Sequence, residues 1–303
     1  MLLVHRGLTA AGAALVAAAS VTQAQTASIS FSNASPAGDP GNAGNTALTG
    51  SFGASFTAQS LHWSGTLTSA PNPFFFEEDV FASIEGPNGL GYTGPIAGQQ
   101  GIVLGNTPFS GWFGGLAPAS INGNWRFEAF TPNSFANATD WSIQNAEFTF
   151  AESLFPDAAP AAVGDDLSFA ITEGEIAWFS IDHAGGPIEL STAGSTLVEL
   201  EGVIQTDDTL IALFDSTGAL VEFNDDASAG ISTSRLFFND LASGDYQLAV
   251  TGATLGTRVG PSFIATSHDA EGDVRLSVAI PAPATAMAFA GALGLLRRRR
   301  IAH

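Results

Sequence analysis

The chain has 303 residues, of which 45% are hydrophobic and only 13% charged, and it contains no cysteine. The lack of cysteine excludes disulfides, thiolate zinc sites and a cysteine nucleophile. The formal net charge of −20 comes from 29 acidic residues against nine arginines, and this makes nucleic acid and anionic lipid unfavourable partners. The 34 glycines and 23 phenylalanines favour short strands joined by polar turns over long solvated helices.

The first 24 residues have the features of a signal peptide. A short basic start at His5 and Arg6 precedes an apolar stretch, and Thr22-Gln23-Ala24 has the small residues that signal peptidase accepts. The alternative, a small-residue helix packed inside a domain, is less favoured at an extreme terminus that runs into a polar segment. We therefore predict cleavage between Ala24 and Gln25, by signal peptidase, during export.

Two stretches of strand-like pattern follow. Apolar and polar residues alternate in Trp125–Phe130 and in Ser142–Phe148, as in half-buried strands. Glycine, proline, asparagine and aspartate interrupt the pattern about every 8–12 residues. We predict an all-β fold of two antiparallel, jelly-roll-like β sandwiches in tandem, at 26–150 and 166–280, joined by an Ala/Pro-rich linker at 151–165. Helix is expected only in the signal peptide and in a short C-terminal sorting segment.

The first predicted sandwich carries three short motifs in order. They are Asp79–Ile84 leading into Gly86–Gly89, then Gly123–Phe127, and finally Asp140–Ile143. In this order the motifs resemble a degenerate proprotein-convertase P domain, which implies a β jelly roll. The acidic loop of that family is replaced here by TPNSFANAT, so the resemblance implies no metal site in this part of the chain.

The second predicted sandwich has a longer signature. The run DDTLIALFDSTGALVEFNDDASAG is followed by SRLFFNDLASGDYQLAVTG. This signature resembles the bacterial pre-peptidase C-terminal-like domains. The resemblance implies a β sandwich of the kind found on secreted enzymes and surface proteins, some of which bind matrix polymers.

The C-terminal residues 281–303 combine a proline motif, an apolar run and an arginine cluster. The apolar run Ala284–Leu296 would span about 20 Å as a helix, which is short against about 30 Å of bilayer hydrocarbon. The arginines would be retained on the cytoplasmic side of the membrane. The motif residues are Pro281, Ala282, Pro283, Arg297, Arg298, Arg299 and Arg300.

This arrangement resembles a PEP-CTERM sorting signal, with Ala282 in the place where the family has glutamate. The resemblance implies transient anchoring in the inner membrane of a Gram-negative bacterium and cleavage by an exosortase-type enzyme. The protein would then be released to the cell surface or the extracellular matrix. Without both ends, the chain keeps four arginines against 29 acidic residues, a net charge of −25.

An acidic hairpin is the candidate metal site. Asp215-Ser216-Thr217-Gly218 has the residues of a β-turn. Simple pairing around this turn would place Asp208 opposite Asp225 and Asp207 opposite Asp226, with Asn224 beside them. Such oxygen ligands suit Ca²⁺ at the concentrations found outside cells. A solvated acidic strand end explains the same residues equally well, and both interpretations stay open.

Aromatic clusters are a second candidate for function. Phe74–Phe76 and Phe109–Phe113 are predicted to lie in Gly/Pro-rich loops, where aromatic side chains can bind polysaccharide or a partner. Packing across the open end of a sandwich is the commoner role, and we favour it. Two of the carboxylates among Glu77, Glu78 and Asp79 could form a glycosidase pair, although the cluster fits the start of a strand better.

Three functions are compatible with these features. A non-catalytic cell-surface or extracellular-matrix protein is favoured, because both resemblances are to accessory domains and no catalytic constellation is evident. A polysaccharide-binding module is the alternative, and a hydrolase with an unrecognised site is a further one. The expected partners are signal peptidase, an exosortase and extracellular polysaccharide, with no nucleic acid and only transient contact with the membrane.

Overall fold

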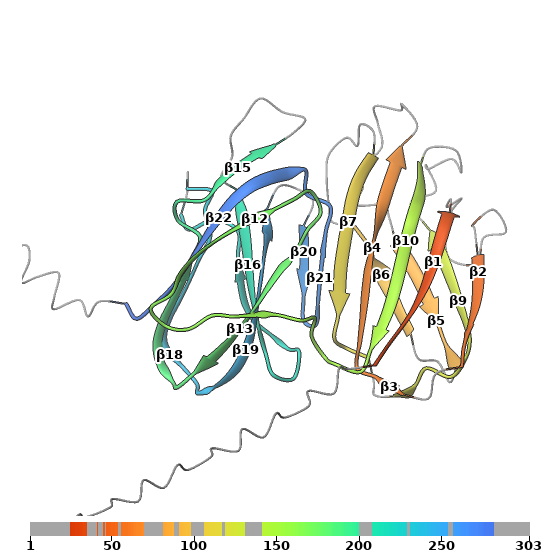
Figure 1. Ribbon diagram of the computed structural model, residues 1–303, viewed down its shortest axis with the longest axis horizontal. Coiled ribbons are helices and arrows are strands. Elements are labelled where there is room, and N and C mark those ends of the chain that lie inside the picture. The colour runs from red at the N-terminus through yellow and green to blue at the C-terminus, as the bar shows by residue number, and fades with distance from the viewer. Residues whose placement is uncertain are drawn as a thin grey trace, which may run out of the picture.

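The structure, a computed structural model, is built from β-strands joined by turns and loops (Figure 1). It describes residues 25–34, 41, 45, 47–53, 56–69, 81–87, 91–97, 106–116, 119–130, 141–199, 208–228, 231–253 and 257–281. These residues form 22 strands and no α-helix, so the predicted all-β fold is confirmed. The predicted signal and sorting helices lie outside the described residues. None of the described segments is a helix that is long and apolar enough to cross a membrane.

The first sandwich contains a four-stranded sheet and most of a six-stranded sheet, both antiparallel. The six-stranded sheet has the order β1 (Thr26–Ala34), β10 (Trp141–Ala151), β4 (Ser60–Ser69), β7 (Asn106–Phe113), β21 (Phe263–Thr266) and β20 (Thr257–Gly260). The four-stranded sheet has the order β2 (Ala47–Phe52), β9 (Gly123–Phe130), β5 (Phe81–Glu85) and β6 (Gly91–Pro95). A short pair, β3 (Thr57–Ala58) and β8 (Ala119–Ser120), lies beside them.

The core of this sandwich follows the alternation of its strands. Trp125 and Phe127 of β9 point inward and meet Phe148 and Phe150 of β10, with the rings of Trp125 and Phe150 4.3 Å apart. On β10 the alternation is interrupted by a bulge at Asn145, whose φ is 50°. The bulge shifts the register, so the inward positions before and after it do not follow one strict period.

The second sandwich also has two sheets. The first of them, the β13 sheet, has the order β11 (Ala159–Pro160), β13 (Ala177–His183), β19 (Gly244–Gly252), β16 (Thr209–Asp215) and β17 (Leu220–Asn224). The other, the β22 sheet, has the order β12 (Asp166–Ile171), β22 (Ala270–Ala279), β14 (Gly186–Ser191) and β18 (Arg235–Leu241), and β15 (Thr196–Glu199) pairs with β22. Their shared core contains Ile181, Leu190, Leu248 and Leu276.

The two sandwiches share strands, which the sequence did not predict. The hairpin β20–β21 follows β19 in the chain, yet β21 pairs with β7 of the first sandwich, with Ile264 opposite Trp112. Figure 1 shows this hairpin between the two sandwiches, next to β7. The six-stranded sheet is therefore completed by a segment that the sequence assigns to the second domain.

An apolar cluster fills the junction between the sandwiches. Trp112, Leu210, Ala212, Phe214, Ala249 and Ile264 are buried in it. Strand β16 therefore has both faces covered, because Leu210 and Phe214 face the junction while Ile211 and Leu213 face the second core. This double burial explains its continuous apolar run.

The predicted linker at 151–165 is part of this packing, and that interpretation needs correction. Leu154 and Phe155 pack in the junction cluster. Further along, Ala161 is buried and its N–H donates to the carbonyl of Ser180, while the N–H of Gly164 donates to the carbonyl of Val278. Alanine and proline in this stretch suit close packing on a neighbouring sheet as well as they suit a loose connection.

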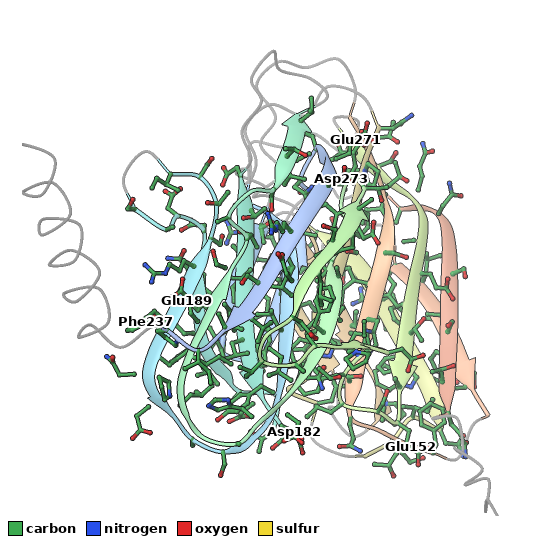
Figure 2. The ribbon with its side chains drawn as sticks, turned by 60° about the vertical axis from the view of Figure 1, so that its left-hand side comes forward. Glu152, Asp182, Glu189, Phe237, Glu271 and Asp273 are labelled. Atoms are coloured by element: carbon green, nitrogen blue, oxygen red, sulfur yellow. The ribbon has the colours of Figure 1, made fainter. Side chains whose placement is uncertain are left out.

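Exposed acidic residues are spread over the surface of the second sandwich. Glu271 and Asp273 lie near one end of β22, whereas Asp182 and, further to the right, Glu152 lie toward the opposite end of the molecule (Figure 2). Two arginines on this sandwich form exposed ion pairs, Arg235 with Glu189 and Arg275 with Asp166. The large negative charge is thus distributed over several elements.

Candidate functional site

A cleft of about 270 Å³ lies at the junction of the two sandwiches. Its floor is the outer face of β10, β4 and β7, and its wall comes from the start of the second sandwich. It is lined by His62, Trp63, Ser64, Ser110, Gly111, Trp112, Glu147, Thr149, Pro156, Ile176 and Trp178. By comparison, a cavity within the first core measures only about 20 Å³, which is room for one water molecule.

The strand register arranges the floor of the cleft in two rows. In one row Glu147, Ser64 and Ser110 lie side by side on β10, β4 and β7. In the next row Thr149, His62 and Trp112 do the same. Because neighbouring strands are about 4.8 Å apart, each row presents one side chain about every 5 Å across the sheet. Only side chains on the outer face of the sheet contribute to these rows.

The wall is held against the floor by specific hydrogen bonds. Ser110 Oγ donates to the carbonyl of Gly174 at 2.5 Å, and Trp112 Nε1 donates to the carbonyl of Leu154 at 2.8 Å. Gly174 has a φ of 64°, and a Cβ there would lie 2.5 Å from the carbonyl oxygen of Pro108. Glycine is therefore required where this turn meets β7. These contacts fix the wall of the cleft relative to its floor.

Histidine 62 is uncharged near neutral pH. Its Nε2 lies 2.9 Å from Ser60 Oγ, and burial lowers the pKa of His62 to about 4. A neutral imidazole has one N–H donor and one acceptor nitrogen. His62 therefore contributes hydrogen bonding to the cleft without charge. Nothing in the sequence around His62 indicates that this side chain faces a cleft.

The aromatic residues predicted in loops have a different setting in the structure. Phe109 and Trp112 belong to strand β7 and are 2% and 1% exposed. Phe109 packs in the first core and Trp112 in the junction cluster. Both side chains pack rather than face solvent, but from a strand and not, as predicted, from a loop across the open end of a sandwich. Phe74–Phe76 and the acidic residues Glu77, Glu78 and Asp79 lie outside the described residues.

The predicted acidic hairpin forms, but in another register. The turn is confirmed, because the N–H of Gly218 donates to the carbonyl of Asp215 at 3.0 Å. Strand β16 then pairs with β17 with Ile211 opposite Asn224. The ladder carries two residues more on its second strand than the simple turn allows. One is added at the turn, where the N–H of Asp215 donates to the carbonyl of Ala219, and the other is Val221, which bulges after Leu220. Asp208 is consequently not opposite Asp225, contrary to the prediction.

These changes also affect the predicted calcium ligands. Asn224 Oδ1 accepts the backbone N–H of Arg235 at 3.0 Å. No three acidic or histidine side chains come together as a metal-binding group among the residues that the structure describes. Asp207 lies outside those residues. Asp208, Asn224, Asp225 and Asp226 thus do not form a ligand set by themselves, and calcium binding stays a prediction from the sequence.

Most of the terminal signals lie outside the described residues. This applies to Ala24 and to the sorting residues Ala282, Pro283 and Arg297–Arg300. Gln25 and Pro281 are the first and last residues of the described fold. The backbone nitrogen of Gln25 lies 3.3 Å from Glu152 Oε2, and the N–H of Glu152 donates to the carbonyl of Gln25 at 2.9 Å.

No protein-family model and no curated protein matches this chain. Among solved structures, it is similar to a serine protease of Aeromonas sobria, with a TM-score of 0.27 and 11% identity over 42% of this chain and 26% of the protease. The chain thus spans about a quarter of that protein.

Two further solved structures are similar over more of the chain. One is N-glycanase F (PNGase F), with a TM-score of 0.25 and 10% identity over 84% of this chain and 99% of that one. The other is a CBM22 tandem domain from Paenibacillus barcinonensis Xyn10C, with a TM-score of 0.22 and 7% identity over 86% and 93%. Scores this low assign neither a fold family nor a function to the chain.

Proposed function

We propose that this chain is a secreted, non-catalytic protein of the cell surface or extracellular matrix, and that it holds a polysaccharide in the junction cleft. The observation that carries this proposal is the combination of groups in the cleft. Trp178 and Ile176 supply an apolar wall, while Ser64, Thr149 and His62 supply hydrogen-bonding groups. Ligand sites of this kind combine apolar contact area with a few placed polar groups.

The chemistry of a sugar ring matches both parts of the lining. Its C–H faces can lie against the tryptophan wall, and its hydroxyls can exchange hydrogen bonds with the rows of the floor. The rows continue beyond the cleft, since Ser30 lies opposite Glu147 and Ser28 lies opposite Thr149 on β1. Several sugar units could therefore contact one face of the sheet, as a polymer ligand requires.

The start of the described fold supports the export part of the proposal. Cleavage before Gln25 would create an α-amino group at the nitrogen that lies 3.3 Å from the Glu152 carboxylate. That amino group would be positively charged at neutral pH, so processing would convert a hydrogen bond into an ion pair. The P-domain-like and pre-peptidase-like resemblances, and removal of the tail by an exosortase, belong to the same proposal.

A glycan array tests the binding function, with a blocking variant and a matched control. Ser64 is exposed in the middle of the cleft, so Ser64→Arg should fill the cleft without disturbing a core. Ser243→Arg adds the same charge on an exposed turn of the second sandwich. We expect the wild-type protein and Ser243→Arg to bind the same glycans and Ser64→Arg to lose them. Equal binding by both variants would contradict the cleft, and release of free sugar would show a hydrolase instead.

Export and sorting are tested separately by intact-mass measurement of the protein from its native cells. The expected mature chain begins at Gln25 and lacks Arg297–Arg300. A mass that includes the arginines would contradict the sorting signal. Recovery of the protein only from the cell interior would contradict secretion.

A further inference from the structure

The junction cleft carries one charged group, and it is negative. Of the described residues that line the cleft, Glu147 is the one acidic residue, no arginine is among them, and His62 is neutral near neutral pH. Glu147 is exposed on the outer face of β10, next to Ser64 on β4. A ligand in the cleft therefore meets a single carboxylate among hydroxyl, imidazole and aromatic groups.

The four arginines that the mature chain would keep interact with residues other than Glu147. Arg126, Arg235 and Arg275 form ion pairs with Glu128, Glu189 and Asp166. The fourth, Arg258, acts on Tyr92, because its charge partly offsets the rise that burial causes in the pKa of that phenol. The described ion pairs thus use carboxylates other than Glu147, whose charge faces the cleft.

The aromatic residues of the cleft add to the preference for positive charge. Trp178 is half-buried in the wall and Trp112 lies beneath it, with their ring centroids 5.4 Å apart. A cation near the face of a tryptophan ring is attracted by the ring's quadrupole. The protein's field acts in the same direction, since the chain without its two ends has a net charge of −25.

We infer that the cleft selects a polysaccharide segment that carries protonated amino groups, with the Glu147 carboxylate pairing with an amine and Trp178 lying against the sugar ring. This inference rests on the proposed polysaccharide-binding function and adds the charge class of the ligand. A uronic-acid polymer would place like charges together and is disfavoured. A fully acetylated amino-sugar polymer keeps the ring contacts and loses the ion pair.

Paired oligosaccharides test the inference on the full chain. The probes are short oligomers of glucosamine and the same oligomers with every amine acetylated, so that the two differ only in charge and acetyl groups. Binding is measured by calorimetry at about pH 6, where the amines of the oligomer are largely protonated. We expect the wild-type protein to bind the amine form about tenfold more tightly, in the range of charge-assisted hydrogen bonds.

Two variants separate the site from the general field of an acidic protein. Glu147→Gln removes the charge in the cleft. Asp182→Asn removes an equal charge from an exposed position on the same face of β13 as Trp178, about 13 Å further along the strand. We expect Glu147→Gln to abolish the preference for the amine, so that this variant binds the two oligomers with equal affinity. Asp182→Asn should keep the preference almost intact.

The outcomes distinguish the inference from the function beneath it. Equal affinity of the wild-type protein for both oligomers would overturn the inference alone. Equal losses in the two variants would also overturn it, because the attraction would then come from the overall charge. Failure of both oligomers to bind, together with an empty glycan array, would overturn the proposed function as well. Unchanged thermal unfolding of Glu147→Gln, expected for an exposed residue, confirms that the variant folds.

Discussion

Trp112 connects the two sandwiches, and replacing it by alanine should uncouple them. Its side chain is 1% exposed, and its ring stacks on Phe155 with centroids 4.9 Å apart. It meets Trp178 and Phe214 edge to face at 5.4 and 5.0 Å, and Nε1 donates to the carbonyl of Leu154. Removal of a buried tryptophan side chain costs about 3–5 kcal/mol. Trp112→Ala also loses aromatic pairs worth about 0.5–1.5 kcal/mol each. We therefore expect its loss of stability to lie at the upper end of the range for a buried tryptophan, near 5 kcal/mol.

The location of this loss matters more than its size. Because the junction cluster and β21 tie both sandwiches to Trp112, we expect the wild-type protein to unfold in one calorimetric transition. In Trp112→Ala the junction weakens, and two transitions should appear. Trp125→Ala is the matched control, because Trp125 is equally buried, at 1% exposed, but packs in the first core against Phe127 and Phe150.

Differential scanning calorimetry of the three proteins decides the question. Trp125→Ala should lower the midpoint by a similar amount and keep a single transition, because the junction is intact. The reasoning fails if Trp112→Ala unfolds in one transition with a loss below about 1 kcal/mol, the range of an ordinary surface substitution. It also fails if the wild-type protein already shows two transitions, since the sandwiches would then be independent.

Three further outcomes are expected. The pKa of His62 is lowered by burial to about 4, so the folded state binds fewer protons than the unfolded chain, and stability should fall by about 3 kcal/mol as the pH drops from about 6.5 to 4. His62→Gln should lack this contribution to the loss of stability, which is checked by measuring the free energy of unfolding in urea at both pH values. Limited proteolysis should not begin within 151–165, because that stretch is packed, and sequencing of the first fragments checks this. Asp215→Ala loses the hydrogen bonds from Thr217 and Ala219 to Oδ1 and should destabilise by about 1–2 kcal/mol in chemical unfolding, while Asp215→Asn should lose less.

Local patterns predicted the parts of the fold that depend on neighbouring residues. Alternation placed Trp125 and Phe127 inward on a strand, as the structure shows. The turn at Asp215–Gly218 followed from its residue types, and Gly218 has the φ of 84° that favours glycine. Strand type and tight turns are set by a few consecutive side chains, so they can be inferred without the rest of the molecule.

Register and strand partners could not be inferred in the same way. One bulge at Asn145 changes which residues of β10 face outward, and another after Leu220 adds to the shift that moves Asp208 away from Asp225. Neither position has a glycine or proline that would mark it. Pairing is also decided between distant segments, because β21 joins β7 about 150 residues earlier in the chain. The sequence of the hairpin β20–β21 is typical of a short antiparallel pair and does not indicate that β21 pairs with β7.

The cleft illustrates why the candidate site was harder to predict than the fold. Glu147 and His62 occupy outward positions on strands of the first sandwich, where a polar residue needs no special explanation. Trp178 lies in an ordinary strand pattern of the second sandwich, and a tryptophan in such a pattern is expected to pack in a core. These three residues line one cleft only because the shared hairpin and the packed segment 151–165 bring the two sandwiches together. Because the floor comes from one sandwich and the wall from the other, any ligand of the cleft depends on the same junction that Trp112 stabilises.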